Sequence, residues 1–468
     1  MLEAVSELRA RRLSAAELLA AVLARIEARN GGAPSFDGAP DAVNAWARLY
    51  PERADAMARA ADERIAREGE AAPPLCGIPV GLKDLYSVSG LPVTASSRVL
   101  EGNVAGEDST VWARLARESM VLVGHTHTHE FAFGGSSDQV GNPWALDHSA
   151  GGSSGGSAAA LAARMVPAAT GTDTAGSLRI PAALSGISSI KPTRGRVPMT
   201  GVIPLAESFD HAGPMARSLA DCSELLRAMA AGAAETIPLA PPPAPMGQLP
   251  TEPSPGARPL EGLKIALLAP PPGVDLDRDV ADGVELAAAA CRRLGARLVE
   301  SERPVLASLD DFYLAVGVEV WSYHEQFAGQ ADVYRPFLRE IMGGVSEAGP
   351  AAEYVRVQRR RARLTSAWER WMADEQADLL LEATVPVSAP LRTVGYEPVL
   401  PAPDPLILLT FTWDMTGFPA VALPAGMGAR SGLPVGVSLI APRGHEPPLV
   451  QAGIDLQEHE LEPPLAPA

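Results

Sequence analysis

Hydrophobic side chains recur at helical spacing through the first seventy residues. Ser14 and Glu17 form a capping box (S-A-A-E) directly before an apolar stripe over residues 18–26. A second, Ala-rich helical run covers residues 54–67. Residues 1–70 are therefore predicted to form N-terminal helices that act as scaffold.

The pattern changes at Leu75, where short apolar runs bounded by glycine and proline begin. CGIPVGLKDL (residues 76–85) and SMVLVGHTHTHEFAFG (residues 119–134) have the length and flanks of buried strands, and helical stretches separate such runs. This alternation predicts an α/β fold, with a central mixed β-sheet covered by α-helices on both faces. Residues 71–235 are assigned to the core of this fold.

A proline-rich segment, residues 236–262, interrupts the alternation. It cannot form regular structure, and we interpret it as a surface connection inside a single domain of residues 1–468. Residues 263–468 then resume the α/β pattern, with strands predicted over 263–270 and 296–301 and a helix over 280–295.

A long helical region follows over residues 309–377, with a break near 343–350. Its arginine run is predicted to be a solvated helix face, composed of Arg356, Arg359, Arg360, Arg361 and Arg363. The most apolar late stretch, residues 405–426, contains Asp414 and three prolines, which predicts buried strand and turn rather than a membrane span.

Composition narrows the possible partners and location. The net charge of -17 argues against a protein held to nucleic acid by its own charge. The N-terminus lacks the continuous apolar segment of a signal peptide, and the three cysteines are far apart without a CxxC pair. We therefore expect a cytoplasmic protein with no membrane and no nucleic-acid partner, as a monomer or homodimer.

Lysine is rare in this chain. The 39 basic residues include only three lysines: Lys83, Lys191 and Lys264. Arginine cannot give up its proton in a protein, whereas lysine can. Each lysine is thus a position to check for a role that arginine could not fill.

Two serine-bearing glycine turns flank one predicted helix between residues 150 and 183. The first turn is GGSSGG, with Ser153 and Ser154, and the second is GTDTAGS, which ends at Ser177. Glycines before a helix let backbone N–H groups point at an anion or a developing negative charge. A single Gly/Ser turn is most simply explained as a flexible loop. Two such turns within apolar structure favour a functional site instead.

Three kinds of chemistry compete for these turns. Residues 151–155 fit G-x-S-x-G, the nucleophile elbow, which needs a downstream histidine and a strand running into the serine, although residues 144–150 are a poor strand. The available histidines are His211, His324, His445 and His459. The interpretation as a phosphate-binding loop has little support, because Ser157 stands where the lysine of such a loop should be. The third possibility uses Lys83 as a base.

The sequence resembles the amidase signature family of serine amidohydrolases. The blocks that carry the resemblance are GIPVGLKDL, GGSSGGSAAA, GTDTAGSLRIPAA, KPTRGRV and SFDHAGPMARS. It extends through LPVTASS, HEFAFGGSSDQVGNPW and the late TGFPAVALPAG and GLPVGVSLIAPR, and it is weakest over residues 235–375. The resemblance covers most of the chain and implies one large amidase signature fold.

The resemblance implies a Ser–cis-Ser–Lys triad in place of Ser-His-Asp. By position, Ser177 is the nucleophile, Ser153 the bridging serine after a cis peptide bond, and Lys83 the base. It implies an oxyanion hole made by the backbone N–H groups of Thr174, Ala175, Gly176 and Ser177, and no metal or organic cofactor.

Neutral lysine can act as a base only if its pKa falls from about 10.4 toward the working pH. Burial achieves this by disfavouring the ammonium form, and Lys83 follows the apolar run GIPVGL. Pairing with the adjacent Asp84 would raise the pKa instead. We therefore expect Asp84 to point elsewhere.

The predicted reaction is hydrolysis of the C–N bond of an amide-like substrate through an acyl-enzyme. A urethanase, which cleaves carbamates with the same triad, is one alternative, and a glutaminase subunit of a tRNA-dependent amidotransferase is another. A non-catalytic anion-binding loop is a third. Departures from the family pattern weaken the amidotransferase alternative and leave the triad untouched: Leu85, Ala175, Ile180 and Asp414.

Other residues are assigned supporting parts. Candidates for the substrate pocket are Phe133, Gly134, Gly135, Tyr313 and Trp321. His125, His127 and His129 alternate as metal ligands on a strand would, but the family implies no metal there. Asp173, Arg179 and Asp210 are predicted to brace the nucleophile turn. Lys191 is predicted to be structural, and Lys264 to be incidental.

Overall fold

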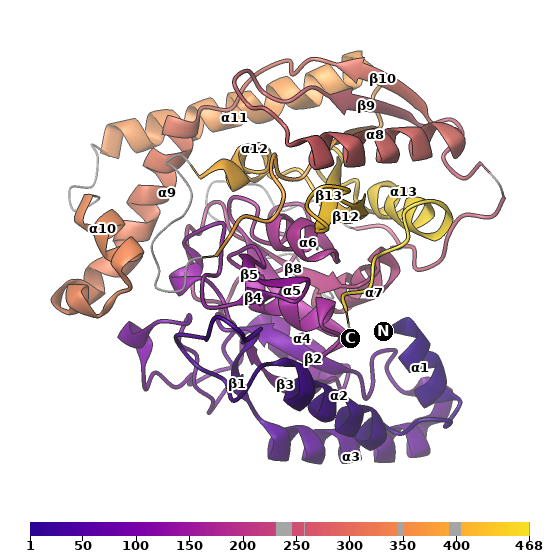
Figure 1. Ribbon diagram of the computed structural model, residues 1–468, viewed down its shortest axis with the longest axis vertical. Coiled ribbons are helices and arrows are strands. Elements are labelled where there is room, and N and C mark those ends of the chain that lie inside the picture. Colours follow the sequence, from indigo (N-terminus) through magenta and orange to yellow (C-terminus); the bar gives the residue numbers. More distant parts are fainter. Residues whose placement is uncertain (231–245, 257, 345–350, 393–403, 468) are drawn as a thin grey trace.

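An eleven-stranded mixed β-sheet forms the centre of the computed structural model, which describes residues 1–230, 246–256, 258–344, 351–392 and 404–467 (Figure 1). In order across the sheet, the strands are β1 (Trp46–Leu49), β3 (Val121–Thr126), β2 (Pro79–Lys83), β6 (Ala168–Asp173), β8 (His211–Ala216), β7 (Ser188–Lys191), β12 (Ala420–Met427), β13 (Pro434–Ile440), β11 (Leu379–Ala383), β9 (Lys264–Leu268) and β10 (Arg297–Ser301). The sheet is parallel at two places, where β2 lies between β3 and β6 and where β9 lies between β11 and β10. The predicted α/β fold with a central mixed sheet is confirmed.

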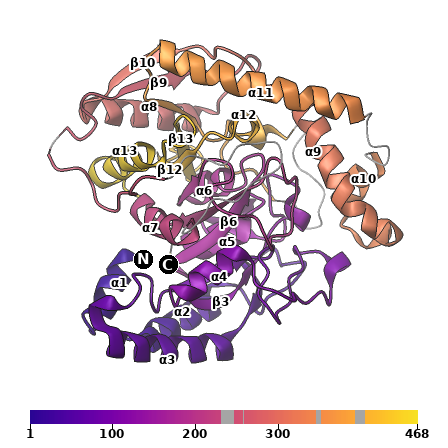
Figure 2. The same ribbon diagram turned by 180° about the vertical axis from the view of Figure 1, so that it is seen from behind.

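Helices cover both faces of the sheet, as predicted (Figure 1 and Figure 2). Successive residues of a strand point to opposite faces. On β13, Gly436 faces Ala183 of α6 (Arg179–Ser185), whereas Val435 faces Gly283 of α8 (Arg278–Arg293). α5 (Gly155–Ala162) packs beside α6, and α7 (Leu219–Met229) packs beside α13 (Glu446–His459), which lies on the α8 face. Most of the sheet is thereby buried, including its central strands.

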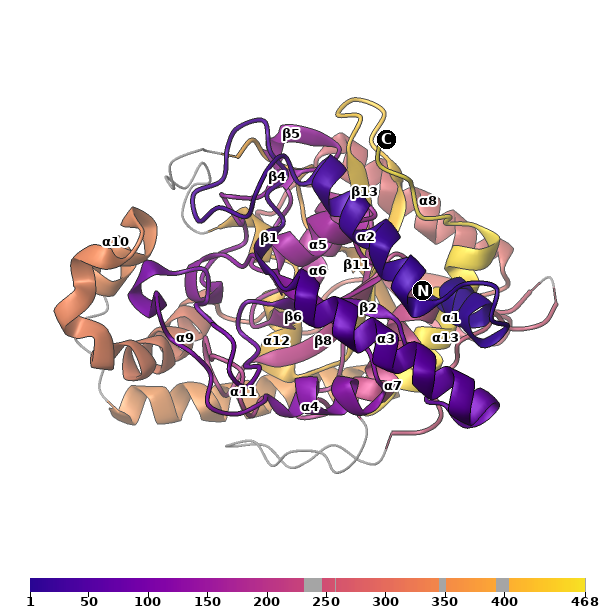
Figure 3. The ribbon, with the colours of Figure 1, turned by 90° about the horizontal axis from the view of Figure 1, so that it is seen from below.

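The N-terminal region is mainly helical. It contains α1 (Leu2–Arg9), α2 (Ala15–Arg29) and α3 (Pro51–Glu68), and the capping box of Ser14 and Glu17 is present at the start of α2. Figure 3 shows α2 and α3 side by side. Residues 46–49 correct the prediction, because they form the edge strand β1 beside β3. A four-residue strand is stabilised by its pairing partner, which helical periodicity cannot reveal.

The second half contains the predicted strand, helix and strand as β9, α8 and β10. The long helical region comprises α9 (Leu309–His324), the 3-10 segment η4 (Glu325–Val333), α10 (Pro336–Gly344) and α11 (Ala351–Asp374). The predicted break at 343–350 falls mostly outside the described residues, as does part of the proline-rich connection 236–262. Residues 246–256 and 258–262 of that connection form no helix or strand.

Two further predictions are corrected. Residues 411–416, expected to be strand or turn, form helix α12 (Phe411–Thr416) after a 3-10 turn, η5 (Pro405–Ile407). Residues 145–149, expected to be a poor strand, form β5 (Ala145–Ser149), which pairs with β4 (Gly141–Asn142) outside the main sheet. No described helix is long and apolar enough to cross a membrane.

The prediction of a solvated arginine face on α11 is wrong for Arg361, which is buried. It is 3% exposed, and its guanidinium carbon lies 3.8 Å from the centre of the Phe209 ring. The guanidinium donates hydrogen bonds to the carbonyl oxygens of Met415 (2.6 Å) and Asp414 (3.0 Å), the last turn of α12. Arginine is well suited to such a place because its planar fork can serve several acceptors at once.

Candidate active site

Lys83 ends strand β2 and points into a cluster of hydroxyl groups. Its Nζ donates hydrogen bonds to Ser153 Oγ at 2.8 Å, Ser154 Oγ at 2.9 Å and Thr172 Oγ1 at 2.7 Å. Thr172 lies on β6, the neighbour of β2, and the two serines precede α5. Among the described residues, no carboxylate lies within ion-pair distance of Nζ. Lys83 is therefore held by neutral groups alone.

Burial changes the protonation of Lys83. The side chain is fully buried, and desolvation lowers its pKa to about 7, although the charges of Asp173 and Asp210 oppose the shift. Asp84 points elsewhere, as predicted, and is bonded to Arg48, Thr94 and Ser96. A lysine with a pKa near 7 is partly neutral at physiological pH, so it can accept a proton.

Ser153 is fixed by its glycine neighbour and by its own carbonyl group. The peptide bond between Gly152 and Ser153 is cis, as the resemblance implied. A Cβ at Gly152 would lie 2.6 Å from the carbonyl carbon of Ser136, so a larger residue does not fit there. The Ser153 carbonyl accepts hydrogen bonds from His129 N and Ser137 Oγ, each at 3.0 Å. These contacts hold the Ser153 hydroxyl in the lysine cluster.

Ser177 lies in the turn that joins β6 to α6. Gly176, beside it, has a φ of 134°, and a Cβ there would collide with the side chain of Thr410. The carboxylate of Asp173 accepts hydrogen bonds from Gly176 N at 2.5 Å and from Leu178 N at 3.2 Å. The turn is thus closed by a carboxylate at its base.

The predicted oxyanion donors are not equivalent in this turn. Gly176 N is engaged by Asp173, which leaves it no free hydrogen for a ligand. No acceptor among the described residues is bonded to the backbone N–H of Ala175 or of Ser177. Ser177 is also 6% exposed, whereas Lys83 and Ser153 are completely buried. Of the three, Ser177 is the side chain that a ligand can reach from solvent.

A buried network of charged side chains holds the turn that contains Ser177. Arg179 donates to both oxygens of Asp173 (2.9 and 3.0 Å), to Asp414 Oδ2 (2.6 Å) and to the Thr410 carbonyl (3.0 Å). The Thr410 hydroxyl in turn donates to the carbonyl oxygen of Ala175. These contacts agree with the predicted bracing role of Asp173 and Arg179. They also explain how α12 is tied to the nucleophile turn.

Asp210 and Lys191 complete this support. Asp210 accepts a hydrogen bond from Thr174 Oγ1 at 2.6 Å, and burial raises its pKa to about 7. Lys191 is fully buried and donates to the Phe418 carbonyl at 2.6 Å, and its Nζ lies 3.2 Å from His211 Nε2. Both residues contact the frame of the site rather than Ser153 or Ser177.

The histidines do not form an elbow triad with Ser153. His211 Nδ1 lies 3.1 Å from the Asp173 carbonyl oxygen, and His324 Nδ1 lies 2.7 Å from Tyr334 Oη. His445 and His459 contact backbone carbonyls of their own helix region. Lys83 is the partner of the Ser153 hydroxyl in the structure.

The three alternating histidines have separate partners. His125 contacts the Tyr50 hydroxyl and the Tyr86 carbonyl, and His127 contacts Ser96 and the Ser35 carbonyl. His129 Nδ1 faces the Glu130 carbonyl, and burial lowers the pKa of His127 and of His129 to about 3. Within the described part of the chain, no group of three or more His, Cys, Asp or Glu side chains could hold a metal ion.

Two of the predicted pocket residues meet at Asp404. Gly135 N donates to Asp404 Oδ2 at 3.1 Å, and burial, together with the Asp404 charge, raises the pKa of Tyr313. The Phe133 ring lies 6.2 Å from that of Phe337, and Gly134 adjoins the His129 ring. Trp321 is half-buried against the main core. The structure records no direct contact of these five residues with Ser177.

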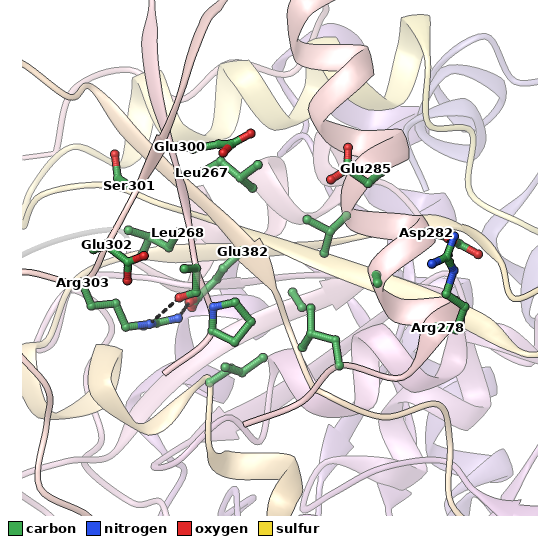
Figure 4. A pocket seen from close by; sticks show the side chains of 17 residues that line it. Leu267, Leu268, Arg278, Asp282, Glu285, Glu300, Ser301, Glu302, Arg303 and Glu382 are labelled. Carbon is green, nitrogen blue, oxygen red and sulfur yellow. Dashed lines mark hydrogen bonds and ion pairs between the residues drawn. The ribbon is translucent and has the colours of Figure 1, made fainter. Parts of the chain in front are cut away.

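A cavity of about 550 Å³ lies elsewhere, beside the carboxyl ends of β9, β10 and β11 (Figure 4). Its lining includes Arg303 and Glu382, which form an ion pair, and no member of the lysine cluster. We do not assign it to catalysis, because the hydroxyl cluster and the nucleophile turn do not open into it.

Sequence reasoning missed three contacts of this site. Ser154 and Thr172 share Lys83 with Ser153, and both stand inside the two glycine motifs. Thr410, which binds the nucleophile turn, follows an apolar run without any distinguishing pattern. The first two had a signal in the sequence, whereas the third comes from tertiary packing alone.

Comparison with known proteins places this geometry in a family. The amidase family model matches residues 35–450. The chain is 37% identical to a glutamyl-tRNA(Gln) amidotransferase subunit of Ralstonia nicotianae, an alignment that covers 97% of this chain and 96% of that protein.

Solved structures give the same result. The peptide amidase from Stenotrophomonas maltophilia matches with a TM-score of 0.81 and 26% identity, covering 99% of this chain and 97% of that one. An inhibitor-bound vestigial protein complex, described as revealing the origins of an s-triazine catabolic enzyme, matches with a TM-score of 0.85 and 28% identity over 99% of both chains. With the family model spanning most of the sequence and the same fold in these enzymes, this chain belongs to the amidase signature family and is a hydrolase of carbon–nitrogen bonds.

Proposed function

We propose that the protein is a stand-alone serine amidohydrolase that uses Ser177 as nucleophile, Ser153 as relay and neutral Lys83 as general base. The observation that carries the proposal is the fully buried lysine with a pKa lowered to about 7, bonded to Ser153. A serine hydroxyl is a poor nucleophile until a base takes its proton, and a lysine in this state can take it.

The reaction follows from these groups in two steps. Neutral Lys83 takes the proton of Ser153, which takes that of Ser177, whose oxygen attacks the carbonyl carbon of the amide. The free N–H groups of Ala175 and Ser177 stabilise the resulting oxyanion. The C–N bond breaks as the relay returns its proton to the leaving nitrogen, and water then hydrolyses the ester on Ser177 to release the acid.

The experiment is a substrate panel with the purified chain alone. Short amides, aryl amides, carbamates and ureas are compared by kcat/KM, with Ser177→Ala as the matched control for background hydrolysis. Turnover of an amide without any partner chain supports the proposal. If Ser177→Ala retains full activity, the assigned nucleophile is wrong.

A urethanase is the alternative that the same groups would serve, since carbamates also present a carbonyl carbon to Ser177. The panel separates the two, because a urethanase would prefer the carbamate over the amide of the same size. Phe133, Gly134, Gly135, Tyr313 and Trp321 remain the proposed substrate-pocket residues in either case.

A glutaminase subunit of an amidotransferase is a second candidate function. Its support is the identity to glutamyl-tRNA(Gln) amidotransferase subunits over nearly the whole length of both chains. Ile180 stands where such subunits commonly have glutamine, and Ala175 and Asp414 depart from the wider family pattern, which is why we rank it second. Ammonia release from glutamine only after addition of partner chains would favour this candidate over the stand-alone enzyme.

A further inference from the structure

The cavity near β9 lies where open α/β sheets commonly bind ligands. Leu268, Ser301 and Ala383 are the last residues of β9, β10 and β11, three parallel strands, and all three line the cavity. The chain leaves β9 toward α8 and leaves β10 toward α9 and α11, and Figure 1 and Figure 2 show β9 and β10 between α8 and α11. Connections that diverge to opposite faces open a crevice at the carboxyl ends of the strands.

Apolar side chains line part of the cavity. The apolar residues next to the cavity form a small cluster that is separate from the main core, composed of Val280, Ala383, Leu409 and Val435. The cavity is open to solvent, and its volume of about 550 Å³ is within the size of ligand pockets. Leu267, Leu276 and Val284 add to the apolar wall. The space is therefore suited to the apolar part of a ligand.

The charges at the floor of the cavity neutralise each other. Arg303 forms an ion pair with Glu382, and their side chains are 5% and 3% exposed. The second Glu382 oxygen accepts a hydrogen bond from Trp413 Nε1, and Arg303 Nε donates to the Ala269 carbonyl at 3.0 Å. The floor therefore has no charge left for a ligand.

The walls have an uncompensated negative charge. Glu300 and Glu302 project from the β10 side and Glu285 from α8 (Figure 4). The remaining rim arginine, Arg278, is paired with Asp282 at 3.0 Å. In the described part of the chain, no cationic side chain lies within 4 Å of the carboxylates of Glu285, Glu300 or Glu302. An anionic ligand is disfavoured here, and a cationic one is favoured.

We propose that this cavity is a second binding site, separate from the Lys83 cluster, for a small organic cation that joins an apolar body to an ammonium group. The apolar part lies against Leu267, Val284 and Leu409, and the ammonium group faces the carboxylates of the walls. Binding at this site does not depend on the catalytic proposal, because none of its residues belongs to the lysine cluster or the nucleophile turn.

The test measures binding of phenethylammonium to the full-length chain by isothermal titration calorimetry at low ionic strength. Its neutral analogue, 2-phenylethanol, has the same apolar body. We expect the ammonium compound to bind at least about tenfold more tightly, the equivalent of about 1.4 kcal/mol. Equal affinity for the two compounds would overturn the proposal.

Two sets of variants locate the site. The triple variant Glu285→Gln/Glu300→Gln/Glu302→Gln should lose at least about tenfold in affinity, whereas Glu63→Gln, an exposed glutamate on α3, should lose none. These are exposed positions, so the fold is retained, and Val284→Trp should abolish binding by filling the cavity. Undiminished binding to the triple variant, or loss of binding in Lys83→Arg, would place the cation elsewhere and refute the proposal.

Discussion

Lys83 and Lys191 are equally buried, but the groups around their amines differ. Both side chains are completely buried, and desolvation lowers the pKa of each to about 7. Lys83 Nζ donates to three hydroxyl groups, whereas Lys191 Nζ contacts a carbonyl oxygen and the ring of His211. The two sites lie on the same sheet, at the ends of β2 and β7.

The difference shows that a shifted pKa alone does not make a base. A hydroxyl can both give and take a proton, so a neutral lysine beside Ser153 can pass protons along a chain of hydroxyls. A carbonyl oxygen only accepts, and the other neighbour of Lys191, the His211 ring, faces the Asp173 carbonyl rather than a serine hydroxyl. Lys191 therefore anchors the Phe418 carbonyl and, among the described residues, has no path to Ser153. The neighbours, rather than the pKa, are the reason why we propose Lys83 as the base and Lys191 as a structural residue.

The largest expected effect is from Lys83→Arg. Arginine retains the positive charge but cannot be deprotonated, so kcat should fall by about 10⁴-fold. Turnover of the best substrate of the panel measures it, and far-UV circular dichroism checks that the fold is retained. Lys264→Arg is the matched control, since Lys264 lies at the protein surface and contacts Glu375; it should keep full activity. Normal turnover by Lys83→Arg would exclude lysine as the base.

The pH dependence of activity should follow the ionisation of Lys83. The active form is the neutral amine, so kcat/KM should be at its plateau above the pKa and fall about tenfold per pH unit below about 7. A pH–rate profile between pH 5 and 9 measures this. Lys191→Met should keep the same apparent pKa. A midpoint that moved in Lys191→Met would mean that the wrong lysine had been assigned to the profile.

The third effect concerns stability. Lys191→Met leaves the Phe418 carbonyl without its donor, which should lower the free energy of unfolding by about 1–3 kcal/mol at pH 10.5, where the lysine no longer has to lose a proton on folding, with kcat reduced less than tenfold. Urea denaturation and steady-state kinetics measure the two quantities. Loss of turnover as large as in Lys83→Arg, with stability unchanged, would contradict the anchoring role.

The smallest effect is on the pH dependence of stability. In the folded protein the pKa of Lys83 and of Lys191 is about 7, below the value of about 10.4 for an unfolded lysine. The unfolded chain therefore binds more protons between these two pH values. The free energy of unfolding should therefore rise with pH in this window, and each lysine should contribute up to about 1.4 kcal/mol per pH unit. Removing one lysine as Lys191→Met should lower this slope, measured by urea unfolding at pH 7.5–9.5. An unchanged slope would mean that Lys191 titrates normally in the fold.

Much of the core could be predicted because local sequence is enough to specify it. The strands over 79–83 and 121–126 and the capped helix from residue 15 arise from periodicity, turn residues and a capping box. The edge strand at 46–49, the helix at 411–416 and the burial of Arg361 could not be predicted. Each depends on a partner far away in the sequence: β3 for the strand, α11 for the helix, and α12 and Phe209 for the arginine.

The sequence by itself determined which residue types were available for the chemistry: one lysine after an apolar run, two serine-bearing glycine turns and their spacing. Only the tertiary structure decided how they meet, because β2 and β6 are neighbours in the sheet although almost ninety residues separate Lys83 from Thr172. It also decided that Asp84 bonds to Thr94 instead of Lys83 and that Asp173 accepts the hydrogen bond of the Gly176 N–H. Burial in the packed structure lowers the pKa of Lys83 to about 7. Desolvation and hydrogen-bond partners are properties of the packed chain, and no local pattern encodes them.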